Sequence, residues 1–218
     1  MPLKYALFDL DGTLTDSMPG IAACARYALD KFGIHPNTQE ELYPYIGPPL
    51  LYSFMNFHGL SREQAEQAVV YYRERYADVG WRENRVFDGI SELLGSLQEK
   101  GVCLIVATSK PEVYTRRILD HFGLTQYFSF VSGSTLDGTR SEKADVIAYA
   151  MQQYSEINRE NTLMIGDRKY DVEGAHSHGL PAVGVLFGYG DRAEMEAAGA
   201  DYVVEDVAEL RKLLHAMA

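Results

Sequence analysis

Three carboxylates crowd the residues that follow the first apolar run of the chain. Tyr5–Phe8 lead directly into Asp9 and Asp11, and Asp16 follows after Gly12. Closely spaced carboxylates repel one another, and the repulsion grows when they leave water. Their oxygens are also the ligands that a hard divalent cation prefers. This segment therefore indicates a site where a cation or a positively charged group holds several acidic side chains together.

Further polar side chains follow later apolar runs. Thr108 and Ser109 come at the end of the run VCLIVA, and Asp167 follows the run TLMIG. Lys143 comes at the start of a predicted helix. In an open α/β sheet, ligands bind beyond the carboxyl ends of the strands. We therefore expect these hydroxyl, carboxylate and ammonium groups to meet Asp9 and the acids beside it at one edge of a sheet.

The elements that must position these groups alternate along the chain. Six short apolar runs have the length and continuous hydrophobicity of strands buried on both faces; they span residues 5–8, 102–107, 127–132, 162–165, 181–186 and 201–204. Helical segments lie between them, with Asp88, Ser141 and Asp206 as capping candidates and Gly123 as a stop. This alternation predicts an α/β fold with a doubly wound parallel sheet.

One segment breaks the alternation. Residues 18–85 show helical periodicity and no convincing strand, and Ser61 with Gln64 forms a capping box for a long helix. We therefore predict an all-helical cap domain at 18–85, inserted into an α/β catalytic core of residues 1–17 and 86–218.

Composition narrows the class of protein. The net charge of −11 argues against binding to nucleic acid or to an anionic membrane through bulk electrostatics. Two cysteines do not form a disulfide framework, and no apolar run has the length of a signal peptide or a membrane span. We expect a cytoplasmic protein, either a monomer or a weak dimer.

Four motifs, in order, resemble those of the haloacid dehalogenase (HAD) superfamily. DLDGTLTD, VATSK, Lys143 in RSEKADVI and IGDRKYDVEGA are similar to its first to fourth motifs. The resemblance covers essentially the whole chain and is greatest to the phosphoglycolate phosphatase-like and 5′-nucleotidase-like branch, whose members often contain a segment like IGPPL at residues 46–50. It implies a Rossmann-like core with a helical cap.

The resemblance implies a role for each motif residue. Asp9 would be a nucleophile that forms an aspartyl-phosphate, which splits one displacement into two easier ones. Asp11 would act as general acid and then as general base. Gly12 would let backbone N–H groups face the phosphate, and Thr108 and Ser109 would bind its oxygens.

The same motifs imply a magnesium site. Mg²⁺ is bound by few carboxylates together with substrate phosphate. Asp9 and Asp167 would supply side-chain oxygens, and Asp11 would supply its backbone carbonyl. Asp171 would support the site by orienting a water or Lys143, while Lys143 would also neutralise charge that develops during transfer.

The expected function is a Mg²⁺-dependent phosphatase acting on a small phosphorylated metabolite. Phosphoglycolate, a nucleoside 5′-monophosphate and a sugar phosphate all remain open as substrates. A phosphomutase of the β-phosphoglucomutase type and an inorganic pyrophosphatase are the alternatives on the same fold. Cleavage of a halide is disfavoured, because Asp11 supplies the acid that phosphate chemistry needs and haloacid cleavage does not. A non-enzymatic binding module is disfavoured, because every expected catalytic position is present.

Some nearby residues have ordinary structural explanations. Asp16 is expected to act as a helix cap or loop residue. Lys110 could bind phosphate or lie exposed, and Arg168 and Lys169 are expected to be exposed.

Overall fold

The computed structural model describes residues 2–38 and 40–218 and separates into two compact units. One unit comprises Met1–Thr15 with Val86–Ala218, and the other comprises Asp16–Arg85. Their roles as catalytic core and cap stay a prediction.

The first unit is built on a parallel sheet. Within the described residues, six strands pair in the order β5-β4-β1-β6-β7-β8, and every pairing is parallel. These strands are β1 (Tyr5–Phe8), β4 (Cys103–Pro111), β5 (Phe130–Ser134), β6 (Thr162–Gly166), β7 (Ala182–Val185) and β8 (Tyr202–Val204). The predicted doubly wound sheet is confirmed. The third predicted run starts later, at Phe130, because the preceding residues Thr125–Tyr127 form a 3-10 turn, η3.

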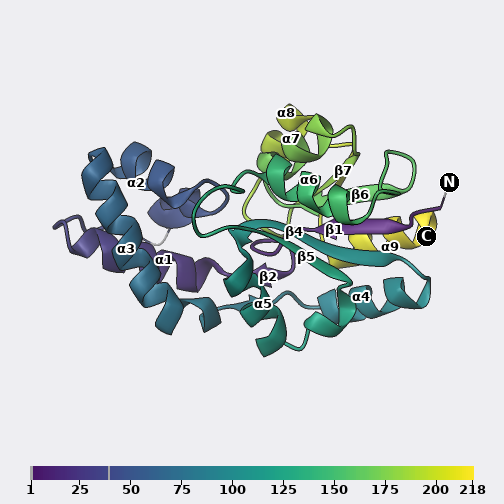
Figure 1. The fold of residues 1–218 in the computed structure, drawn as a ribbon, viewed down its shortest axis with the longest axis horizontal. Coiled ribbons are helices and arrows are strands. Elements are labelled where there is room, and N and C mark those ends of the chain that lie inside the picture. The colour runs from purple at the N-terminus through teal and green to yellow at the C-terminus, as the bar shows by residue number, and fades with distance from the viewer. Residues whose placement is uncertain (1, 39) are drawn as a thin grey trace. The chain divides into compact units, whose positions relative to one another are not determined.

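Helices cover both faces of this sheet. Figure 1 shows α6, α7 and α8 on one face and α4 and α9 on the other. The helices of this unit are α4 (Ile90–Glu99), α5 (Glu112–His121), α6 (Lys143–Gln153), α7 (Lys169–Ser177), α8 (Arg192–Ala198) and α9 (Val207–Met217). Side chains of the central strands, such as Leu7 and Met164, form one buried cluster with Ile147 of α6 and Val172 of α7. This apolar layer fixes the helices that carry Lys143 and Asp171.

Two of the predicted helix starts differ from the structure. Asp206 caps α9 as predicted, since its side chain accepts a hydrogen bond from the Glu209 amide. Asp88 is not a cap, because α4 begins after Gly89, whose φ of 84° suits glycine. The cap of α6 is Glu142 rather than Ser141.

The second unit is helical, as predicted. It contains α1 (Met18–Asp30), η1 (Glu40–Tyr45), α2 (Leu50–His58), α3 (Arg62–Asp78) and η2 (Gly80–Arg82). The capping box of Ser61 and Gln64 is present at the start of α3. Two short strands that the sequence did not indicate, β2 (Thr15–Asp16) and β3 (Arg85–Val86), pair where the chain passes between the units. None of the described helices is both long and apolar enough to cross a bilayer.

An ion pair links α3 to the segment that follows η2. The Arg75 guanidinium donates to both carboxylate oxygens of Glu83, at 2.6 and 2.9 Å, and to Cys24 Sγ of α1 at 3.3 Å. The hydrogen bonds from Arg75 lower the pKa of Glu83 below its usual value, although partial burial opposes this effect. The pair therefore stabilises the folded second unit only while Glu83 is ionised.

We predict that Glu83→Gln destabilises the protein in a pH-dependent way. Because the folded-state pKa of Glu83 is lowered, its contribution is present above the usual glutamate pKa and is lost as the pH falls through the lowered value. At pH 7 the variant should lose at most about 1 kcal/mol of unfolding free energy, since the pair is partly exposed. Well below the usual glutamate pKa of about 4.3, the difference should vanish.

Denaturant unfolding at the two pH values measures this difference. Glu74→Gln, which changes an exposed glutamate of α3, is the matched control and should have little effect at either pH. A Glu83→Gln deficit that does not depend on pH would contradict the ion-pair explanation.

Candidate active site

The candidate site lies where the strand order of the sheet reverses. β1 has β4 on one side and β6 on the other, so successive connections run in opposite directions from this point. A crevice forms beyond the carboxyl ends of the strands at such a switch point. Asp9 directly follows β1, Asp167 directly follows β6, and Thr108 lies near the end of β4. The topology therefore brings together motifs that are more than 150 residues apart.

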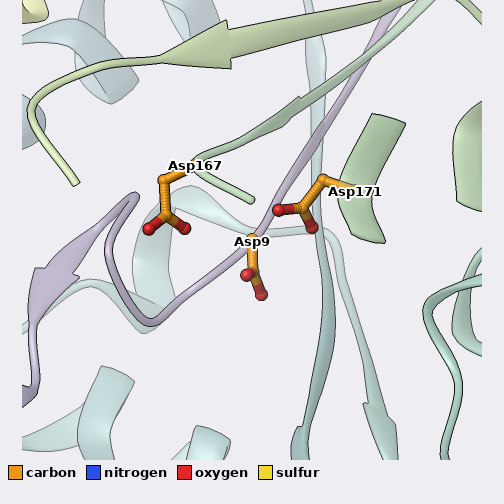
Figure 2. A group of neighbouring side chains, drawn as sticks. All are labelled: Asp9, Asp167 and Asp171. Carbon is orange, nitrogen blue, oxygen red and sulfur yellow. The ribbon is translucent and has the colours of Figure 1, made fainter. Parts of the chain in front are cut away.

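Three buried carboxylates converge there. Asp9, Asp167 and Asp171 each offer one oxygen, and these oxygens lie within 4.8 Å of one another. Figure 2 shows the three side chains side by side on separate segments. Burial first, and then the neighbouring carboxylates Asp171 and Asp9, raise the pKa of Asp167 well above its ordinary value. Burial also raises the pKa of Asp171 to about 6, against the opposing effect of Lys143.

Lys143 is the ammonium group of this cluster. It is the first residue of α6, and its Nζ lies 2.8 Å from Asp9 Oδ1 and 2.7 Å from Asp171 Oδ1. It also donates a hydrogen bond to the carbonyl of Ala107, at 3.1 Å. Burial alone would lower the pKa of Lys143, but the two carboxylates, Asp171 foremost, raise it above its usual value. Lys143 is therefore a cation held between Asp9 and Asp171.

The cluster has the chemistry of a site for a divalent cation. Among the described residues, Asp9 Oδ1 and Asp171 Oδ1 are buried and lack a hydrogen bond of good geometry, so their attraction to Lys143 is mainly coulombic. One ammonium lies beside a cluster of three buried carboxyl groups, so negative charge is in excess when all three are ionised. A buried charge without a partner is costly. Oxygen ligands in this number fit a hard divalent cation.

Glycines allow the carboxylate of Asp167 to approach the backbone. Gly12 has a φ of 82°, and a Cβ at this position would lie 2.1 Å from Asp167 Oδ2. A Cβ at Gly188 would lie 2.3 Å from the carbonyl of Gly12. The Tyr189 amide donates to Asp167 Oδ2 at 2.8 Å, and the Thr13 hydroxyl donates to Asp167 Oδ1 at 3.4 Å. The loop after β7 is thus part of the site.

Asp11 is paired with a second lysine. Its Oδ2 accepts a hydrogen bond from Lys110 Nζ at 2.6 Å. The expectation that Lys110 could lie exposed is wrong, because its side chain is only 6% exposed. The carboxylate of Asp11 is therefore paired with Lys110, whereas Asp9 and Asp171 are paired with Lys143.

The other predicted residues have defined places. Thr108 is buried and accepts a hydrogen bond from the Lys110 amide at 3.3 Å, while Ser109 is half-buried beside it. Asp16 pairs with Arg85 rather than capping α1. The expectation that Arg168 is exposed is wrong, because it pairs with Glu194 at 2.9 Å and its side chain is largely buried. Thr108 and Ser109 directly follow Ala107 in the chain, and the carbonyl of Ala107 accepts a hydrogen bond from Lys143.

The loop at residues 187–190 and the pairing of Lys110 with Asp11 were not expected from the sequence. The only signal for the loop was the pair of glycines in FGYG after the fifth apolar run. Tyr189 acts through its backbone amide, so its side-chain type carries no information about this contact. Lys110 could be recognised only from its burial and its pairing with Asp11.

We predict that a divalent cation stabilises the folded protein and that Asp167 is required for this effect. Mg²⁺ at a hundred times its dissociation constant should add about 2.7 kcal/mol to the unfolding free energy. Asp167→Asn replaces one of the three clustered carboxylates by a neutral amide, which is a much weaker ligand for Mg²⁺, so the stability of the variant should respond little to Mg²⁺. Thermal unfolding with and without MgCl₂ measures the shift.

The matched control for this experiment is Asp88→Asn, which removes an exposed carboxylate of the same unit. It should keep the full response to Mg²⁺. An equal response in Asp167→Asn would show that the cation binds elsewhere.

Comparisons with known proteins show the family of this chain. The family model for haloacid dehalogenase-like hydrolases matches residues 6–185. A 5′-nucleotidase of Pseudomonas aeruginosa is 44% identical to this chain, and the match covers 97% of this chain and 96% of that protein. The tyrosine-protein kinase PtkA of Mycobacterium tuberculosis is 43% identical, and the match covers 98% of this chain and 72% of that protein. The crystal structure of a predicted phosphatase from Clostridium acetobutylicum superposes with a TM-score of 0.95 at 46% identity, covering 99% of this chain and 100% of that one. The chain belongs to the haloacid dehalogenase-like hydrolase family.

Proposed function

We propose that this chain is a phosphatase that hydrolyses a small phosphorylated metabolite through an aspartyl-phosphate on Asp9. The observation that carries the proposal is the buried convergence of Asp9, Asp167 and Asp171 around Lys143 at the switch point, in a chain of a hydrolase family. The similarity to a 5′-nucleotidase makes a nucleoside 5′-monophosphate the first substrate to test. Phosphoglycolate and sugar phosphates follow as candidates.

The first step transfers the phosphoryl group to the protein. An oxygen of Asp9 forms a bond to phosphorus while the bond from phosphorus to the alcohol oxygen breaks. Asp11 gives a proton to the departing oxygen. The amides next to Gly12, the hydroxyl of Thr108 and the amide of Ser109 would bind the phosphoryl oxygens. The Ser109 side chain is half-buried, in keeping with a position at the rim of the site.

The second step returns Asp9 to its free form. Asp11 takes a proton from water, whose oxygen attacks phosphorus, and the bond between phosphorus and Asp9 breaks. Lys143 stays beside Asp9, at 2.8 Å, and so neutralises negative charge that develops in both steps. Asp171 holds this ammonium from the other side, at 2.7 Å.

Mg²⁺ is the proposed cofactor. Asp9 and Asp167 would hold it through their side chains and Asp11 through its backbone carbonyl, with Asp171 as a supporting residue. When bound, it would offset the repulsion between these carboxylates and the phosphate dianion. We further propose that the helical unit, residues 18–85, acts as the cap that selects the substrate.

We predict that Asp9→Asn abolishes turnover and leaves the fold intact. Asparagine has nearly the same shape but is a poor nucleophile, so kcat should fall on the order of 10³-fold or more. Phosphate release and a thermal unfolding curve measure the two properties. Asp16→Asn is the matched control in the same segment, and it should retain activity because Asp16 pairs with Arg85. Hydrolysis at the normal rate by folded Asp9→Asn would refute the nucleophile.

A phosphate-release screen tests the function as a whole. We expect kcat/KM to be highest for one phosphomonoester among nucleoside 5′-monophosphates, sugar phosphates and phosphoglycolate. EDTA should stop the reaction, and Mg²⁺ should restore it. Activity confined to pyrophosphate would indicate a pyrophosphatase, and a requirement for a bisphosphate activator would indicate a phosphomutase. No phosphate release from any of these compounds with Mg²⁺ present would contradict the proposal.

Phosphoryl transfer to tyrosine is a second candidate, because a relative that is 43% identical is named a tyrosine-protein kinase. The two functions differ in the acceptor of the phosphoryl group. Labelled nucleoside triphosphate supplied with a tyrosine-containing protein separates them, since the label ends either in free phosphate or on tyrosine. Label on tyrosine would favour the second candidate.

A further inference from the structure

Lys110 forms a buried ion pair with Asp11. Its Nζ lies 2.6 Å from Asp11 Oδ2, and the exposed fractions of the two side chains are 6% and 16%. Lysine is seldom buried unless it is paired. Shielding from water strengthens the attraction and restricts the geometry of the pair. The pair therefore fixes the position of Asp11 Oδ2.

The backbone of Lys110 is also held in place. The pairing of β4 with β5 changes register between Ala107 and Pro111, and such an irregularity re-aims the side chains within it. The Lys110 amide donates to Thr108 Oγ1 at 3.3 Å, and its carbonyl accepts from the hydroxyl of the buried Thr115 at 3.5 Å. The ammonium group thus extends from an anchored point toward Asp11.

The two oxygens of Asp11 differ in their surroundings. Oδ2 is bound by Lys110, whereas Oδ1 is buried and has no hydrogen-bond partner among the described residues. Lys143, by contrast, contacts Asp9 and Asp171. The two lysines therefore serve different carboxylates of the site.

We propose that Lys110 is a positioning residue that holds Asp11 by Oδ2 and leaves Oδ1 to exchange the proton. This inference rests on the proposed phosphatase function. In the first step the Oδ1 proton passes to the alcohol oxygen as its bond to phosphorus breaks. In the second step a proton of water passes to Oδ1 as the water oxygen attacks phosphorus and the bond from phosphorus to Asp9 breaks.

Leaving-group dependence tests this role. p-Nitrophenolate departs without protonation, whereas an alkoxide requires a proton from Asp11. In Lys110→Met, kcat/KM for the best alkyl phosphate of the wild-type protein should fall roughly 10²-fold, which is within the range that general acid catalysis contributes. For p-nitrophenyl phosphate the loss should stay below about tenfold, and KM for both substrates should change little. Lys212→Met, which removes an exposed ammonium of α9, is the matched control.

A double-mutant cycle separates action through Asp11 from a direct role. In the Asp11→Asn background, Lys110→Met should add little further loss with the alkyl phosphate, because the residue on which Lys110 acts is already altered. Lys110→Gln keeps a hydrogen-bond donor and should show the same dependence on the leaving group with a smaller loss. This variant also provides the test if Lys110→Met does not fold.

Three outcomes would overturn the proposal. Equal increases of KM for both substrates would make Lys110 a phosphate ligand. A lowered Tm with unchanged leaving-group dependence would make it only a structural residue. Additive losses in the double mutant would show that it acts independently of Asp11. A wild-type protein that hydrolyses neither substrate with Mg²⁺ present would instead contradict the phosphatase function itself.

Discussion

The crowding of carboxylates at the end of β1 is the constraint on which the rest of the site depends. Asp9, Asp167 and Asp171 lie together in the interior, where their mutual repulsion is large and water cannot screen it. Burial first, and then the neighbouring carboxylates, raise the pKa values of Asp167 and Asp171. A buried cluster of this kind needs a compensating cation, and the buried Lys143 supplies part of the compensation.

The fold is adapted to this constraint in its backbone as well as in its charges. Gly12, Gly166 and Gly188 stand where a Cβ would collide with Asp167 or Asp171. The amide of Tyr189 and the hydroxyl of Thr13 give Asp167 directed hydrogen bonds. The apolar layer beneath α6 and α7 holds Lys143 and Asp171 at fixed distances from the strand ends. Packing and electrostatics therefore select the same geometry.

The residues assigned to chemistry all belong to the unit of residues 1–15 and 86–218. The ion pairs described above for Asp9, Asp11 and Asp171 lie within that unit. The chain is similar both to a protein named a 5′-nucleotidase and to one named a tyrosine-protein kinase.

The sequence by itself determined the α/β class, the six strands and the residues expected to meet at the switch point. Buried strands and capping residues such as Asp206 leave local patterns, because apolar runs and helix ends depend on neighbouring residues. The cap predicted at Asp88 was wrong because Gly89 can adopt a positive φ and begin the helix itself.

Only the tertiary structure decided which charges pair. Lys110 and Lys143 are the same residue type, but they have different partners. Lys110 pairs with Asp11, whereas Lys143 lies between Asp9 and Asp171. The contact of Tyr189 with Asp167 uses a backbone amide, which every residue except proline possesses. Such pairings depend on distances between segments that are remote in the chain, and no local pattern of residues encodes those distances.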